Sequence, residues 1–164
     1  MDTIRFDILP APDVAHPDED VYTYPSIRIV VNGRDLLDLV REVELPFAAA
    51  QGSPGIAGGY VGLEPEILGT QHFLGGAEGL YRGPILERNS APNRVAMMIC
   101  DCGEPGCWPF TAAISVENDR ITWSDFRQPH RPGWKYDALG PFTFSRQEYE
   151  AALRQMADSL HGPR

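Results

Sequence analysis

The residues best able to do chemistry are three cysteines, Cys100, Cys102 and Cys107, which lie within eight positions of one another. Thiolates bind soft and borderline metal ions, and they act as nucleophiles where a neighbouring cation lowers the thiol pKa. The spacing Cys-x-Cys-x4-Cys differs from the paired Cys-x2-Cys spacing of common zinc modules. The chemistry therefore depends on whether the fold brings a fourth group, such as His130, to the three thiols.

The elements that would position these thiols are strands. Residues 94–101, 108–117 and 120–127 predict three consecutive antiparallel strands, and Asn118-Asp119 predicts a two-residue turn between the last two. The larger apolar side chains of these strands fall on one face, which we expect to be the core: Val95, Met97, Ile99, Trp108, Phe110, Ile114, Val116, Ile121 and Trp123.

The strand register carries the prediction of a site. Extending the register of the 118–119 turn places Cys107 opposite His130, and a four-residue loop over 103–106 places Cys100 opposite Pro109. Because side chains alternate between faces, the three cysteines and His130 would then project to the same side, away from the core. A single β-bulge would break this arrangement.

Three interpretations of the cysteines stay open. Cys100, Cys102, Cys107 and His130 supply the four donors of a tetrahedral Cys3His zinc site. Alternatively, Cys107 is a nucleophilic or redox thiol whose pKa His130 lowers, as in a thiol-dependent enzyme. In the third interpretation the cysteines are reduced and packed as small hydrophobic side chains around a Gly- and Pro-containing hairpin.

A second candidate site follows the last of these strands. Arg127, Gln128, Arg131 and Trp134 combine guanidinium, amide and indole groups in a segment stiffened by prolines. Such a segment can form the rim of a binding site for a small anionic ligand or a peptide. The two arginines would also add positive potential beside the thiols.

The rest of the chain predicts an α+β domain built mainly on antiparallel strands. Alternation predicts strands over 3–9 and 22–31, and the period of apolar residues predicts a short helix near 36–44, capped by Asp35 and ended by Pro46. Residues 46–92 hold ten of the 16 glycines and form a Gly/Pro-rich irregular connection that could cover a ligand.

A C-terminal helix is predicted over about 146–160, packed on the apolar face of the sheet. Ser145 and Glu148 form a capping box at its start. Its apolar stripe consists of Tyr149, Ala152, Leu153, Met156 and Leu160. We expect residues 1–164 to form a single domain.

Composition restricts the partners. The 164 residues contain 14 Lys and Arg against 23 Asp and Glu, a formal net charge of −9. Nucleic-acid affinity comes from clustered cations that neutralise phosphates, so neither nucleic acid nor an anionic membrane is expected as a partner. The acidic surface would suit a basic protein, whereas a small anionic ligand would bind near His130 and Arg131.

The sequence also predicts where the protein resides. No apolar run approaches the roughly 20 residues of a membrane-spanning helix, and the N-terminus has no apolar signal region. An odd number of cysteines need not be paired in a reducing compartment. We therefore expect a cytoplasmic protein, either a monomer or a homodimer formed through exposed edge strands.

The last third of the chain contains four runs of residues: Cys-Asp-Cys-Gly-Glu-Pro-Gly-Cys-Trp-Pro-Phe at 100–110, Trp-Ser-Asp-Phe at 123–126, Gln-Pro-His-Arg at 128–131 and Leu-Gly-Pro-Phe at 139–142. With these runs the chain resembles a group of small uncharacterised bacterial proteins. The resemblance begins at about residue 90. It implies a bacterial origin, a single intracellular domain and a Cys-x-Cys-Gly-x-x-Gly-Cys-Trp-Pro hairpin, and it supplies no activity.

The leading hypothesis from the sequence is therefore a cytosolic binding or interaction module, rather than an enzyme, with a structural cysteine hairpin that zinc would stabilise. The alternative is the thiol-dependent enzyme or redox protein that uses Cys107 and His130.

Overall fold

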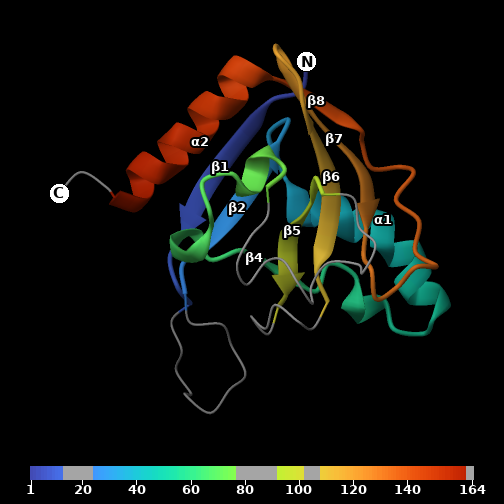
Figure 1. Ribbon diagram of the computed structural model, residues 1–164. Coiled ribbons are helices and arrows are strands. Elements are labelled where there is room, and N and C mark those ends of the chain that lie inside the picture. Colours follow the sequence, from blue (N-terminus) through green and yellow to red (C-terminus); the bar gives the residue numbers. More distant parts are fainter. Residues whose placement is uncertain (13–23, 77–91, 102–107, 162–164) are drawn as a thin grey trace.

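Two antiparallel sheets face each other in the computed structural model, which describes residues 1–12, 24–76, 92–101 and 108–161 (Figure 1). The first sheet has the order β1-β2-β3 and consists of β1 (Ile4–Leu9), β2 (Ser26–Val31) and β3 (Arg34–Asp35). The second has the order β4-β5-β6-β7-β8 and consists of β4 (Tyr60–Gly62), β5 (Arg94–Cys100), β6 (Phe110–Val116), β7 (Arg120–Arg127) and β8 (Phe142–Ser145). The predicted α+β class is confirmed.

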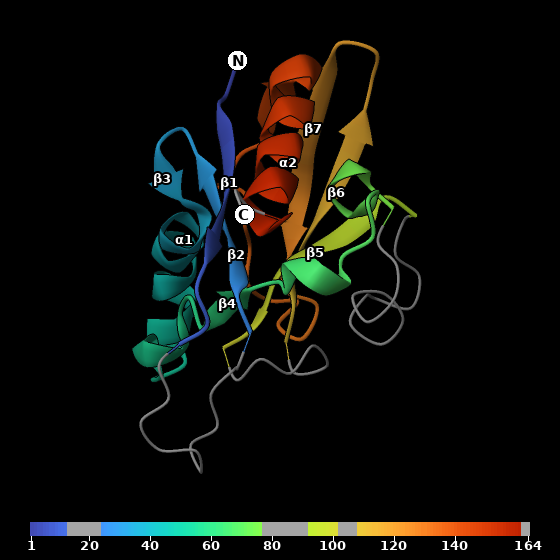
Figure 2. The ribbon, with the colours of Figure 1, turned by 90° about the vertical axis from the view of Figure 1, so that its left-hand side faces the viewer.

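Two long helices flank the sheets, α1 (Leu36–Ala50) and α2 (Arg146–His161). Helix α1 packs against β2, and α2 packs against β1, β7 and β8, so that β1 and β2 run between the two helices (Figure 2). Three single-turn 3-10 helices complete the described part: η1 (Pro54–Ile56), η2 (Pro65–Ile67) and η3 (His72–Leu74). Neither of the two long helices is apolar enough over a sufficient length to cross a bilayer, as far as the described residues go.

The two sheets are tied together at two places. An isolated bridge joins Asp2 to Phe144 in β8, and the Ile27 amide of β2 donates to the Leu63 carbonyl at 2.9 Å, just beyond β4. Beside this second tie, Gly62 lies directly under β2, where a Cβ atom would stand 2.0 Å from the Ile27 carbonyl oxygen. Glycine is therefore required at position 62 so that the two backbones can approach.

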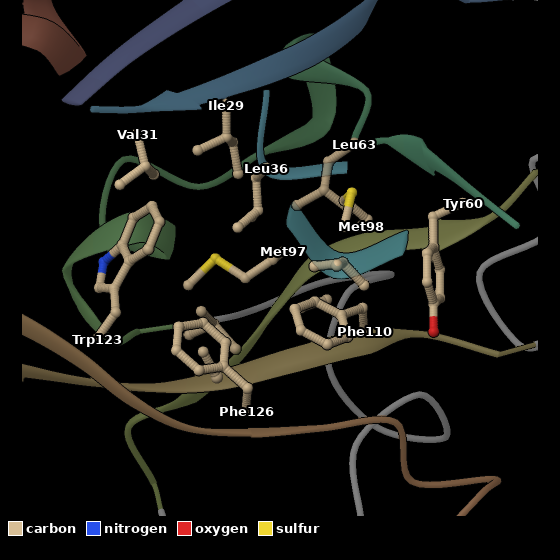
Figure 3. Packing of buried hydrophobic residues seen from close by; sticks show 14 of the residues in the cluster. Ile29, Val31, Leu36, Tyr60, Leu63, Met97, Met98, Phe110, Trp123 and Phe126 are labelled. Atoms are coloured by element: carbon tan, nitrogen blue, oxygen red, sulfur yellow. The ribbon is translucent and has the colours of Figure 1, made fainter. Parts of the chain in front are cut away.

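The core fills the space between the sheets. Ile29 and Val31 of β2 point toward Met97 of β5 and Trp123 of β7, all of them buried (Figure 3). Burial of this contiguous apolar cluster is the main driving force for the fold. The predicted core residues are confirmed apart from Val116, which is 38% exposed near the β6–β7 turn, and Trp108, which is half-buried.

The predicted local signals before β4 are largely present. The Asn32-Gly33 turn ends β2, and both of its residues have positive φ, 53° and 79°, which is the geometry that such a turn needs. The Asp35 carboxylate caps α1 by accepting from the Leu37 amide at 2.9 Å.

The predicted end of this helix is wrong, because α1 continues through Pro46 to Ala50. Pro46 cannot donate to the carbonyl of Glu42, but both residues lie on the exposed side of the helix, where water satisfies that carbonyl. The buried side continues beyond the proline through Glu44 and Ala48, both 0% exposed. Tertiary packing therefore outweighs the local cost of the proline.

Helix α2 begins with the predicted capping box, in which the Glu148 amide donates to the Ser145 hydroxyl at 3.4 Å. Tyr149 and Ala152 of its apolar stripe are buried, and Leu153 and Met156 are partly buried against the core. The Tyr149 hydroxyl donates to the Phe73 carbonyl at 2.5 Å, which fixes the first turns of the helix over η3.

The predicted strand register is correct near the β6–β7 turn and wrong farther along. Ile114 pairs with Trp123 as predicted, but the register shifts between Ala113 and Thr111, so that Thr111 pairs with Arg127. The register of β5 with β6 also shifts, between Ala96 and Met98, and Met98 pairs with Phe110. The two shifts remove the basis for the pairings that the sequence predicts from the turns, Cys107 with His130 and Cys100 with Pro109.

The register shift between β6 and β7 is a bulge in β7, and its physical cause lies at Asp125, whose φ is 52°. Its carboxylate accepts from the guanidinium of Arg94, a β5 residue that is only 2% exposed, at 2.5 Å, and from that of Arg127 at 2.9 Å. A buried arginine is costly without a charged partner. The ion pair offsets the cost of the unusual backbone at Asp125.

A second expectation about the strands is also wrong. All of β5 is buried, including Cys100, which is predicted from the sequence to project away from the core. On that strand the His72 ring of η3 hydrogen-bonds the Ala96 carbonyl at 2.8 Å. The predicted irregular connection over 46–92 likewise contains part of α1, β4 and the three 3-10 helices, and its residues 77–91 lie outside the described part.

Candidate functional site

The described part of the cysteine segment ends at Asp101. Cys100 is the last residue of β5 and pairs with Tyr60 of β4; its side chain is 2% exposed, and its thiol donates to the Asp101 carboxylate at 3.7 Å. Cys102 and Cys107 lie outside the described residues. Over the part of the chain that the structure does describe, no three His, Cys, Asp or Glu side chains are placed to hold a metal ion.

Beside Cys100, a buried carboxylate lies among hydrogen-bond donors. Glu44 of α1 is 0% exposed, and its Oε2 accepts from the Tyr60 hydroxyl at 2.5 Å and the Tyr136 hydroxyl at 2.6 Å. Its Oε1 accepts from the Gly58 amide at 2.8 Å. This Glu44–tyrosine cluster ties α1, β4 and the segment after β7 together through one charged group.

The two phenols of the Glu44–tyrosine cluster remain protonated at neutral pH. Burial is the main cause that raises the pKa of Tyr60 and of Tyr136 far above the ordinary value of 10.0, and the Glu44 carboxylate raises both further. The positive charge of Arg131 acts in the opposite direction on Tyr136. Both hydroxyls are therefore donors, and Glu44 has no solvent exposure through which a substrate would reach it. The cluster supports its surroundings and is not itself a reaction centre.

Near this cluster, one arginine side chain packs over two indole rings. The Arg131 guanidinium carbon lies 4.8 Å from the ring centroid of Trp108 and 4.9 Å from that of Trp134. The Trp108 indole is itself held by a hydrogen bond from its Nε1 to the Gly59 carbonyl at 2.9 Å. We call Trp108, Arg131 and Trp134 the arginine–tryptophan stack.

The backbone that presents the stack is a series of tight turns. The Arg131 amide donates to the Gln128 carbonyl at 2.9 Å, and the Trp134 amide donates to the Arg131 carbonyl at 3.0 Å. The Gln128 side-chain oxygen accepts from the His130 amide at 2.8 Å. This local hydrogen bond from side chain to backbone fixes the first turn. Gln128, Arg131 and Trp134 are thus joined by two successive backbone turns.

Two buried N–H groups adjoin the stack without an acceptor. Gln128 is 1% exposed and Trp134 is 5% exposed, yet Gln128 Nε2 and Trp134 Nε1 have no hydrogen-bond partner among the described residues. Buried donors are satisfied in most folded proteins, so unsatisfied ones frequently mark places where another group binds.

The structure brings together some of the predicted site residues and separates others. Gln128, Arg131 and Trp134 of the predicted rim share one segment, as expected, whereas Arg127 is occupied by its ion pair with Asp125. His130 is exposed and Cys100 is buried. The predicted four-donor set therefore has only these two members in the described part, and they differ in environment.

The sequence motifs do not point to the buried Glu44–tyrosine cluster of Glu44, Tyr60 and Tyr136. One signal was present: Leu36, Val40, Glu44 and Ala48 follow one another at a spacing of four, which places Glu44 on the buried face of α1. A carboxylate on an apolar helix face requires a partner. The partners themselves, 16 and 92 residues away along the chain, could not be inferred from sequence spacing.

Comparison with models of known protein families, with curated proteins and with solved structures returned no match.

Proposed function

We propose that this protein is a binding module that takes a small anionic ligand, specifically a carboxylate, at the arginine–tryptophan stack. The observation that carries the proposal is the Arg131 guanidinium, which lies over the rings of Trp108 and Trp134 and makes no hydrogen bond or ion pair with any described residue. The N–H groups at the edge of the guanidinium are therefore available to an anion.

The chemistry of that edge selects the ligand. A guanidinium presents parallel N–H groups that match the two oxygens of a carboxylate, and stacking lowers the entropy lost when they bind. The Trp108–Gly59 hydrogen bond at 2.9 Å and the turns at 128–134 hold the arginine in place before any ligand arrives.

The test is a titration with succinate followed by NMR of the indole N–H signals. The expected result is a saturable shift of the Trp108 and Trp134 signals in the parent protein and its loss in Arg131→Gln. Arg120→Gln, which removes an exposed arginine at the start of β7, is the matched control and should titrate as the parent does. Absence of a saturable shift with both succinate and inorganic phosphate, or equal shifts in Arg131→Gln, would overturn the proposal.

The cysteine hairpin enters this proposal as a structural element that zinc stabilises. Cys100, Cys102, Cys107 and His130 offer three thiolates and an imidazole, a donor set that suits zinc. Cys100 and Trp108 flank the hairpin, and Trp108 is one wall of the stack. A metal-bound hairpin would therefore hold one wall of the binding site.

Metal analysis of protein purified without chelator, combined with thiol counting in the native state, tests this element. About one zinc per chain with three slowly reacting thiols supports it. Absence of metal with one fast thiol at neutral pH would instead favour the thiol-dependent enzyme that uses Cys107 and His130. Absence of metal with three inert thiols would leave the cysteines as packing residues.

The proposal places the protein in the cytoplasm, where free thiols persist. The net charge of −9 makes a basic protein the second class of partner. A carboxylate ligand at Arg131 would be compatible with such a partner, because the acidic surface and the stack use different groups.

A further inference from the structure

A second hollow in the molecule is formed by different elements, the C-terminal half of α2 and the segment that contains η2 and η3. It has a volume of about 680 Å³, which is in the range of pockets for small molecules. Its apolar lining comes from both walls: Pro65, Leu68, Phe73 and Leu74 on one side and Leu153, Met156, Ala157 and Leu160 on the other. We call this hollow the α2 groove.

The groove exists because the apolar stripe of α2 is fully covered only in the first turns of the helix. Tyr149 and Ala152 are buried against the core, whereas Met156 and Leu160 of the same stripe are only partly buried and face the groove. In Figure 1 α2 runs alongside β1 on the outer side of the sheet. An apolar stripe that is only partly covered marks a place for an apolar ligand.

The groove is elongated along the helix. A neighbouring hollow of about 600 Å³, lined among others by Phe6, Ile8 and Pro25, shares Glu66 and Leu160 with the α2 groove. From Arg154 to Leu160 the helix rises about 9 Å, and the second hollow continues beyond Leu160. Two adjoining hollows along one helix fit an extended chain better than a compact ring.

The charged side chains that line the groove indicate where an anionic group would bind. Of the charged side chains on its α2 wall, Glu150 is neutralised by Arg146 at 2.9 Å, whereas Arg154 is exposed and has no ion pair with a described residue. Arg154 lies along the α2 wall between Glu150 and Leu160, and Glu66 lines both hollows. The aliphatic stem of an arginine can follow an apolar wall while its guanidinium faces an anion.

We propose that the α2 groove binds a single-chain amphiphile with a carboxylate head, such as a medium-chain fatty acid. The carboxylate binds Arg154 and the alkyl chain follows Met156 and Ala157 toward Leu160 and the second hollow. This site does not depend on the arginine–tryptophan stack, since the two share no residue.

Calorimetric titration with octanoate, decanoate and dodecanoate tests the chain. Each methylene that enters the groove should tighten binding about fourfold, until the groove is filled. Ala157→Trp places an indole in the groove from an exposed position and should weaken decanoate binding at least about tenfold. Gln155→Trp, an exposed α2 position that does not line the groove, is the matched control and should bind as the parent does.

The head group is tested with Arg154→Gln. Decanoate should bind this variant about tenfold more weakly than the parent, whereas decanol should bind both equally. The exposed Arg120→Gln is the control for a lost positive charge. No binding of any of the three carboxylates, no increase of affinity with chain length, or equal losses for decanoate and decanol in Arg154→Gln would overturn the proposal.

Discussion

Removing one hydroxyl from the Glu44–tyrosine cluster should destabilise the protein measurably. In Tyr136→Phe the ring keeps its T-shaped packing on Phe110, 5.2 Å between centroids, but the 2.6 Å hydrogen bond to Glu44 is lost. Tyr60→Phe likewise keeps its contact with Phe110 and loses the 2.5 Å bond. Each change therefore isolates one donor to the same carboxylate oxygen.

The magnitude follows from burial and charge. A hydrogen bond to a charged group contributes about 1.5–3 kcal/mol, and a buried charge that loses a partner costs at the upper end of that range. Because Glu44 is 0% exposed, water does not replace the lost donor, and each single variant should lose about 2 kcal/mol. The double variant leaves Oε2 without either phenol, so its loss should exceed the sum of the single losses by about 1 kcal/mol.

The assay is urea unfolding at neutral pH, followed by circular dichroism for the parent, both single variants and the double variant. Thr122→Val is the control for the loss of a hydroxyl, because Thr122 is half-buried and its contact with Thr143 is 3.5 Å long; it should lose less than about 0.5 kcal/mol. Single losses below about 0.5 kcal/mol, or strictly additive losses, would refute the argument that a charged, water-excluded Glu44 holds these elements together.

Three further predictions concern pH and packing. Burial raises the pKa of Tyr60 and Tyr136 above that of the unfolded chain, so the stability that these two phenols contribute is fully present below pH 10.0 and falls as the pH rises further. Unfolding measurements at about pH 9 and pH 11 give this loss of stability, and the two Phe variants should show a smaller loss. Burial lowers the pKa of His72, so stability falls as the pH drops below 6.5 to the folded pKa, and His72→Gln should flatten that part of the curve. Gly62→Ala should lower the free energy of unfolding in urea by about 3 kcal/mol, because the new Cβ atom meets the backbone of β2. Gly133→Ala, which has open space around it, is the control and should lower it by less than about 0.5 kcal/mol. Similar values for the two variants would contradict the close approach of Gly62 to β2.

Local signals were sufficient for several elements. The Asn32-Gly33 turn, the Asp35 cap and the Ser145–Glu148 capping box each act over a few neighbouring residues, and all three are present in the structure. The register next to the 118–119 turn was likewise predictable, because a two-residue turn fixes the first pairs of a hairpin. Such features depend on backbone geometry near the residue and little on the rest of the fold.

Long-range compensation explains where the predictions were wrong. Pro46 has a strong local tendency to end a helix, but the buried positions Glu44 and Ala48 keep α1 packed on both sides of it. The bulge near Asp125 depends on Arg94, 31 residues away, and it alone is enough to shift the register on which the pairing of Cys107 with His130 rested.

The candidate sites show the same division. The sequence predicts a ligand rim of Arg127, Gln128, Arg131 and Trp134, because polar and aromatic groups come together in a segment stiffened by prolines. It could not indicate that Trp108 completes the arginine–tryptophan stack, since that contact depends on how the end of β7 returns toward the start of β6. The α2 groove was equally hidden, because the stripe on α2 predicts only that the helix must be covered.

By itself the sequence determined the α+β class, the apolar residues of the core, the caps and turns and the acidic character, because period, cap chemistry and composition are encoded within a few residues of each position. Only the tertiary structure decided that Glu44 meets Tyr60 and Tyr136, that Arg131 lies over two indoles and that the end of α2 borders a groove. The physical reason is that these contacts join residues far apart in the chain, and their geometry depends on bulges, backbone crossings and helix lengths that are set by packing of the whole molecule.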